Sequence, residues 1–188
     1  MYLGIALQRK QRYADAEDNF RKALNDPDVP RARVYTGLGI IFSRQGDYRK
    51  AEVEYRKAYE LDPGFPMYAN NLSYIYARQG KNLDEALRLA NRALAAIPAT
   101  DPTRGYALDT RGWVYYQLGK YSEAESDVSQ AISVAEKFSP ESLAPRHFLL
   151  GQIYAKTNRT ALAKKEYEKA LMHDKGHKEA AEALRRLQ

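Results

Sequence analysis

The sequence predicts an all-α protein, built as an α-solenoid of antiparallel helix pairs. Three observations lead to this fold class. Helix-favouring residues dominate the composition and β-branched residues are few. Proline and glycine recur in short clusters that would end one helix and begin the next. Finally, the chain repeats itself in five registers, at spacings of 34 to 39 residues.

Each register has the same order of residue types. A small residue is followed seven positions later by a turn residue, and then by two alanines that are seven positions apart. The small residues are Gly4, Gly39, Ser73, Gly112 and Gly151. The turn residues are Gln11, Gly46, Gly80, Gly119 and Asn158. The first alanines are Ala16, Ala51, Ala86, Ala124 and Ala163. Each register therefore predicts two helices joined by a tight turn, with the small residues where the two helices cross.

The repeats divide the chain into five helix pairs and a terminal capping helix. In chain order the predicted units are 1–30, 31–65, 66–104, 105–143, 144–176 and, for the cap, 177–188. The first unit lacks the opening turn of its first helix, so we expect the chain to be a fragment of a longer protein. The connections "TDPTR" and "SPESL" are about five residues longer than the others, which predicts extended or shifted helices there.

Gly112 precedes the single tryptophan, Trp113, in the interior of a predicted helix. Glycine costs a helix interior about 1 kcal/mol relative to alanine. We therefore expect the second helix of this unit to pass so close to Gly112 that a side chain would obstruct it.

This pattern resembles the tetratricopeptide repeat. The family's glycine, tyrosine and two alanines stand here at Gly39, Phe42, Ala51 and Ala58, and Pro63 closes that unit. The resemblance covers nearly the whole chain and is greatest to bacterial members of the family. It implies a right-handed superhelix in which the first helix of each unit lines a concave surface, where protein partners bind.

One departure from the family lies next to Gly112. Arg111 stands where the family usually has leucine. We expect this arginine to be a structural ion-pair partner rather than a ligand contact.

The first helices carry a stripe of aromatic and polar side chains that suits peptide binding. A step of 100° per residue places Trp113 and its stripe away from the face that Gly112 turns toward the second helix. Aromatic rings offer rigid contact area, amides pair with a peptide backbone, and arginine holds a carboxylate at two points. The predicted groove residues are Arg44, Asn70, Asn71, Tyr74, Arg78, Tyr106, Thr110, Trp113 and Gln117. A second interpretation stays open for Tyr74 and Trp113, namely that they pack against each other and fix the curvature.

The sequence thus predicts a non-enzymatic interaction module with a protein or peptide partner, without a cofactor or a small-molecule substrate. No Ser/His/Asp or paired-carboxylate arrangement recurs at a useful spacing. His173, Asp174 and His177 lie together, but Gly176 interrupts the helix that would align the two histidines, so we expect no metal. No apolar run approaches the ~20 residues of a membrane-spanning helix. The compartment is not indicated, because an earlier signal would be missing from a fragment.

Two alternatives concern the ends of the chain. Met1, Tyr2, Leu3 and Ile5 make the first end apolar, which favours self-association into a structural scaffold. Residues 144–188 carry 10 basic and 5 acidic side chains, a less favoured contact surface for an anionic partner or nucleic acid. Basic and acidic residues alternate along most helices, which is typical of a solvated face and argues against a phosphate track.

Overall fold

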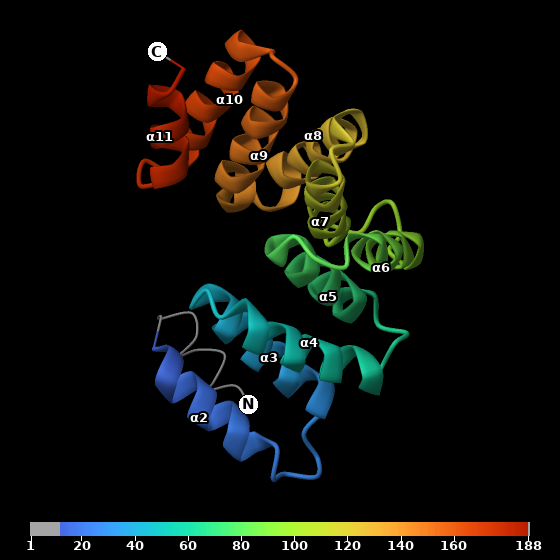
Figure 1. Cartoon of the computed structure of the whole chain (residues 1–188). Coiled ribbons are helices and arrows are strands. Elements are labelled where there is room, and N and C mark those ends of the chain that lie inside the picture. The colour runs from blue at the N-terminus through green and yellow to red at the C-terminus, as the bar shows by residue number, and fades with distance from the viewer. Residues whose placement is uncertain (1–11, 188) are drawn as a thin grey trace. The chain divides into compact units, whose positions relative to one another are not determined.

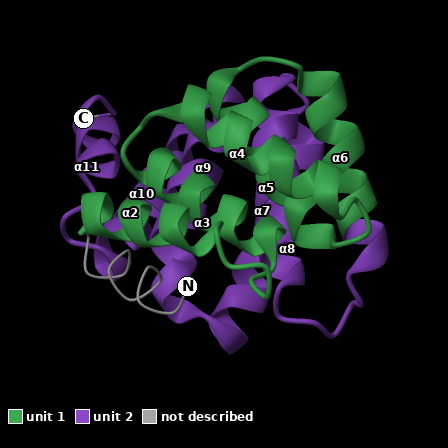
Figure 2. Cartoon of the chain, turned by 90° about the horizontal axis from the view of Figure 1, so that it is seen from below, with its two compact units in different colours: residues 1–93 green, residues 94–188 purple. Residues whose placement is uncertain are grey.

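The structure, a computed structural model, describes residues 12–187. This part of the chain contains ten α-helices and no strand, so the predicted all-α class is confirmed (Figure 1). The helices fall into two compact units, residues 1–93 and 94–188, and each is described by itself (Figure 2). Within the described residues no helix combines the length and the apolar character needed to cross a bilayer.

The first unit is a row of helices, of which the first four pack each on the next. Its helices are α2 (Tyr13–Ala23), α3 (Arg31–Arg44), α4 (Tyr48–Leu61), α5 (Pro66–Gln79) and most of α6 (Leu83–Ala96). Buried rings fill the space beside small residues. A Cβ atom on Gly37 would lie 2.5 Å from the ring of Phe20, and one on Gly39 would lie 2.6 Å from the ring of Tyr55. Glycine therefore lets these helices approach closely.

The second unit repeats this arrangement. Its helices are α7 (Arg104–Gln117), α8 (Tyr121–Phe138), α9 (Leu143–Lys156), α10 (Thr160–His173) and α11 (Lys178–Arg185), with a short 3₁₀ turn at Pro140–Ser142. The extra residues before "SPESL" extend α8 to 18 residues, where most helices have 14. The extra residues of "TDPTR" instead lengthen the loop between α6 and α7. One long connection therefore extends a helix, and the other extends a loop.

The tight turns lie where the repeat predicts them. Gly46, Gly80 and Gly119 have φ values of 79°, 63° and 73°. Asn158, in the fifth register, has φ 59°. This left-handed conformation is costly for most L-residues, and asparagine is the residue that tolerates it best after glycine. The fifth turn therefore keeps its geometry although its residue differs.

The close approach expected at Gly112 is confirmed. A Cβ atom there would lie 2.6 Å from Cγ2 of Val128 and 3.4 Å from the carbonyl oxygen of Ala124, both on α8. Ser73 occupies the equivalent position in α5. Its hydroxyl donates a buried hydrogen bond of 2.7 Å to the carbonyl oxygen of Ala86 on α6, so a small polar side chain also fits this crossing.

Candidate functional site

The predicted stripe in the first unit comes from the first helices of two repeats. Arg44, at the end of α3, and Arg78, near the end of α5, are exposed, and Asn71 and Tyr74 are partly buried. Arg78 donates a hydrogen bond of 2.9 Å to the hydroxyl of Tyr48 and lies over its ring. Asn70 differs from the others because only 4% of it is exposed. Its side chain offers no free surface to a ligand.

The predicted stripe in the second unit lies on α7 and is also only partly accessible. Tyr106 is 43% exposed and Gln117 is exposed, whereas Thr110 is 5% exposed. Trp113 is partly buried and packs against the apolar core of α8 and α9. Its ring stacks on that of Tyr116, with centroids 5.5 Å apart. Trp113 therefore contributes to packing within its unit and still keeps part of its surface exposed.

Arg111 has the structural role that the sequence predicts. It forms a two-point pair with Asp127 on α8, through bonds of 2.6 and 2.8 Å. The Asp127 side chain is 4% exposed, so the pair lies largely out of water. The hydrogen bond to Asp127 raises the pKa of Arg111, and the guanidinium is thus held by α8 rather than by a ligand.

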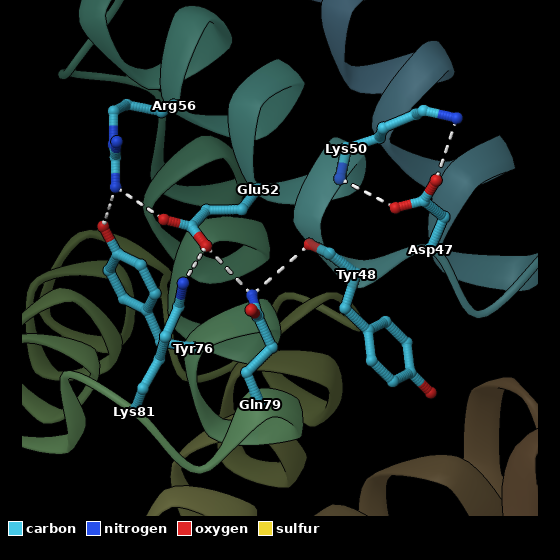
Figure 3. Close-up of polar contacts among 8 residues, drawn as sticks. All are labelled: Asp47, Tyr48, Lys50, Glu52, Arg56, Tyr76, Gln79 and Lys81. Carbon is cyan, nitrogen blue, oxygen red and sulfur yellow. Dashed lines mark hydrogen bonds and ion pairs between the residues drawn. The ribbon is translucent and has the colours of Figure 1, made fainter.

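A polar network joins α4 to α5 and the turn that follows α5 (Figure 3). The nearly buried carboxylate of Glu52 accepts hydrogen bonds from Arg56 at 2.7 Å and from Gln79 at 3.0 Å, and its ion pair with Lys81 measures 2.6 Å. Arg56 also donates to the hydroxyl of Tyr76. Burial, the largest influence, raises the pKa of Glu52, but the bonds from Lys81 and Gln79 outweigh it and lower the pKa overall.

The second unit has an equivalent bond between consecutive repeats. Glu125, like Glu52, directly follows the first alanine of its register, and it pairs with Arg159 at 2.6 Å. Arg159 directly follows the turn residue Asn158, as Lys81 follows Gly80. These carboxylates hold the next turn in place, so they belong to the scaffold that positions the stripes.

Histidine and carboxylate side chains meet in α9 and α10. Nδ1 of His147 lies 2.7 Å from Oε2 of Glu166, and Nζ of Lys169 lies 2.7 Å from the other carboxylate oxygen. The ring of His147 stacks on that of His173. Within residues 12–187 no group of three or more His, Cys, Asp or Glu side chains is arranged to hold a metal ion. The His147–Glu166 pair is buried, and it joins two helices.

The structure has a pocket at the end of the second unit that the sequence does not predict. It has a volume of about 350 Å³ and is lined by residues of α7, α9, α10 and α11 and by the residues that follow α11. The lining residues are Tyr116, Gln152, Ala155, Lys156, Tyr167, Ala183, Arg186 and Leu187. Gln152 and Lys156 continue the predicted stripe by register, which is the signal that identifies them from sequence. No such signal in the sequence identifies Ala183, Arg186 and Leu187, the lining residues from α11 and the segment that follows it.

The apolar first end lies outside the described residues. Met1, Tyr2, Leu3 and Ile5, the residues of the predicted self-association surface, precede residue 12. Self-association through them stays a prediction.

Curated relatives share parts of this chain. The Photosystem I assembly protein Ycf3 of Rippkaea orientalis is 36% identical over 84 residues, which are 44% of this chain and 49% of Ycf3. The anaphase-promoting complex subunit 3 of Schizosaccharomyces pombe is 26% identical over 157 residues, which are 84% of this chain and 22% of that subunit. The chain therefore spans about half the length of the Ycf3 proteins of Rippkaea orientalis and Cyanophora paradoxa.

Solved structures with the same fold cover almost the whole chain. A thermophilic tetratricopeptide-repeat protein of Thermus thermophilus has a TM-score of 0.75 at 22% identity, covering 100% of this chain and 96% of that one. PilF of Pseudomonas aeruginosa has a TM-score of 0.73 at 20% identity, covering 99% and 80%. At these identities the likeness concerns the fold alone, and it confirms the predicted solenoid of helix pairs.

The family comparison agrees with the repeat pattern and with the fold. The tetratricopeptide repeat family matches residues 1–63, 66–137 and 144–177, which is well over half of the chain. The matched segments contain the recurring small residues, turn residues and alanines, and the structure turns them into consecutive helix pairs. The chain therefore belongs to the tetratricopeptide repeat family.

Proposed function

We propose that this chain is a non-catalytic interaction module that binds an extended peptide or a helix of a partner protein along the stripes of its first helices. The family supports a role as a protein-interaction scaffold in general. The assembly role named for the Ycf3 relatives and the complex named for the fission-yeast subunit are compatible with it.

The observation that carries this proposal is the incomplete burial of aromatic and polar side chains on both stripes. Tyr74 and Trp113 keep part of their surface exposed, and Arg44 and Gln117 are exposed. Aromatic residues bury much surface at a low cost in side-chain entropy, and they dominate the binding energy of many interfaces. Asn70 and Thr110 are too buried for direct contact. These two buried residues would instead help to hold the exposed stripe residues in position.

The proposal is tested by affinity capture and mass spectrometry with three baits. These are the wild-type chain, the Tyr74→Ala/Trp113→Ala variant and a control variant, Phe65→Ala/Phe138→Ala. The control removes one exposed ring from each unit, since Phe65 is 45% and Phe138 is 57% exposed. Each capture is carried out with and without nuclease, and circular dichroism checks the helical content of each bait.

We expect the wild-type and control baits to capture a partner protein that the Tyr74→Ala/Trp113→Ala bait does not capture. The helical content of that bait should equal that of the wild type. Recovery of the same proteins with all three baits would contradict binding through the stripes. A partner that disappears after nuclease treatment would point to nucleic acid instead.

A further inference from the structure

The pocket beside the capping helix is positively charged. Two cationic side chains line it, Lys156 at the end of α9 and Arg186 just after α11, and no carboxylate is among its lining residues. In the described part of the chain Lys156 has no carboxylate partner within ion-pair distance. Arg186 pairs with Glu182 at 3.8 Å, and 81% and 55% of these side chains are exposed. Such an exposed pair neutralises little, because water screens it.

The charge of the pocket continues into the surrounding sequence. Residues 144–188 carry 10 basic and 5 acidic side chains, whereas residues 66–143 carry 8 and 9. The excess of positive charge is therefore concentrated in the segment that forms most of the pocket. The electrostatic field of such a positively charged surface attracts anionic partners and speeds their association.

One of the lining residues, Gln152, has a buried hydrogen-bond acceptor without a donor. Oε1 of Gln152 is buried and accepts no hydrogen bond from any residue between 12 and 187. A buried polar atom without a partner costs about 1–3 kcal/mol. Rotation of the partly buried Gln152 side chain would bring this oxygen to the pocket, where an incoming N–H group removes that cost. A peptide backbone carries such a group at every residue except proline. A phosphate group has no such donor, so this atom favours a peptide over a contact made through phosphates alone.

Two tyrosines complete the lining. Tyr116 is partly buried and Tyr167 is almost completely buried. Burial raises the pKa of both hydroxyls, so the rings stay neutral and add no negative charge to the pocket. Tyr116, which keeps part of its surface exposed, provides apolar contact area for the aliphatic part of a side chain, and the buried Tyr167 packs beneath it in the pocket wall.

We propose that this pocket binds an acidic segment of a partner protein. Carboxylates of the segment pair with Lys156 and Arg186, a backbone N–H donates to Oε1 of the rotated Gln152 side chain, and the ring of Tyr116 contacts the apolar parts. The proposal rests on the peptide-binding function proposed above and adds both the chemistry of the partner and a contact surface that includes the capping helix.

The test begins with selection of a random twelve-residue peptide library on the full chain. We expect the enriched peptides to contain more Asp and Glu than the starting library. The strongest binder is then labelled with fluorescein and titrated by fluorescence anisotropy. Its affinity should fall by about tenfold or more in Lys156→Glu/Arg186→Glu, because both attractive charges become repulsive. A several-fold loss is expected in Gln152→Met, which removes the acceptor at a similar side-chain volume.

A matched control separates this pocket from the general charge of the chain. Lys165→Glu/Lys178→Glu makes the same change in net charge at two exposed lysines that do not line the pocket. We expect the control to retain most of the affinity. A peptide in which amides replace the acidic residues should bind wild-type protein several-fold more weakly than the original peptide binds wild-type protein. This comparison does not depend on the folding of any variant.

The possible failures are distinguishable. Two results would overturn the proposal that the pocket binds an acidic segment and would leave peptide binding by the chain intact. One is a set of enriched peptides without an excess of acidic residues, and the other is equal affinity of the peptide for Lys156→Glu/Arg186→Glu and for the wild type. Selection of no peptide at all would overturn both proposals. A labelled twelve-nucleotide single strand that binds more tightly than the best peptide and is lost in Lys156→Glu/Arg186→Glu would assign the pocket to nucleic acid.

Discussion

Gly112→Ala offers a quantitative test of the packing between α7 and α8. The added methyl group would lie 2.6 Å from Cγ2 of Val128, whereas carbon atoms in contact prefer 3.5–4.0 Å. Val128 is fully buried and β-branched, so it has one strongly preferred rotamer in a helix and cannot turn aside. The carbonyl oxygen of Ala124, at 3.4 Å, limits movement in the other direction.

Two opposing effects set the expected magnitude. Alanine favours the helix by about 1 kcal/mol over glycine. Overpacking a close contact costs about 1–3 kcal/mol. We therefore expect Gly112→Ala to lower the free energy of unfolding by up to ~2 kcal/mol. In a Val128→Ala background the obstructing methyl is gone, and the same substitution should raise it by about 1 kcal/mol.

The assay is urea denaturation of the wild type, both single variants and the double variant. Circular dichroism follows the whole array and the fluorescence of Trp113 follows the hairpin that contains the substitution. Agreement of the two signals is needed, because helical repeats do not always unfold in one step. A coupling energy below about 0.5 kcal/mol between the two sites would refute the steric explanation for Gly112.

Two further predictions concern buried charges. Arg111→Leu, which restores the family's usual residue, should destabilise the chain by about 3 kcal/mol, because Asp127 is left buried without its partner. Arg111→Leu/Asp127→Ala should recover most of this loss, and a double variant as unstable as the single one in urea would contradict the role of the pair. Burial, the largest influence, raises the pKa of Glu166, but the bonds with His147 and Lys169 lower it overall below its ordinary 4.5. The carboxylate therefore contributes stability above pH 4.5 that is lost as the pH falls through the lowered pKa. Glu166→Gln should be less stable than the wild type at neutral pH and should lose less stability on acidification below 4.5, and parallel pH curves for the two proteins would refute this.

The fold could be predicted from the sequence because its constraints are local and repeated. A turn with positive φ requires glycine or asparagine, as at Gly46 and Asn158, and a close helix crossing requires a small residue, as at Gly112. These requirements recur every 34 to 39 residues, so each register supports the others. The structural role of Arg111 could be predicted for a related reason, since a charged residue at a position that faces the neighbouring helix needs a partner.

The site could be predicted only in part. The 100° step gives the direction of Asn70 or Thr110 around its own helix, but burial depends on which neighbouring element covers that direction. The structure buries both, and it exposes much of Tyr106. Likewise, Lys156 and Arg186 share a pocket although they are far apart in the sequence, since α11 brings the second to the first.

The sequence alone thus determined the helix pairs, their turns and the residues at their crossings, because hydrogen bonding and backbone sterics act between near neighbours in the chain. Only the tertiary structure decided which stripe residues remain accessible, how Glu52 and Glu125 hold the next turns, and where unneutralised positive charge gathers. These properties depend on contacts between helices, and packing and electrostatics act through space without regard to the order of residues.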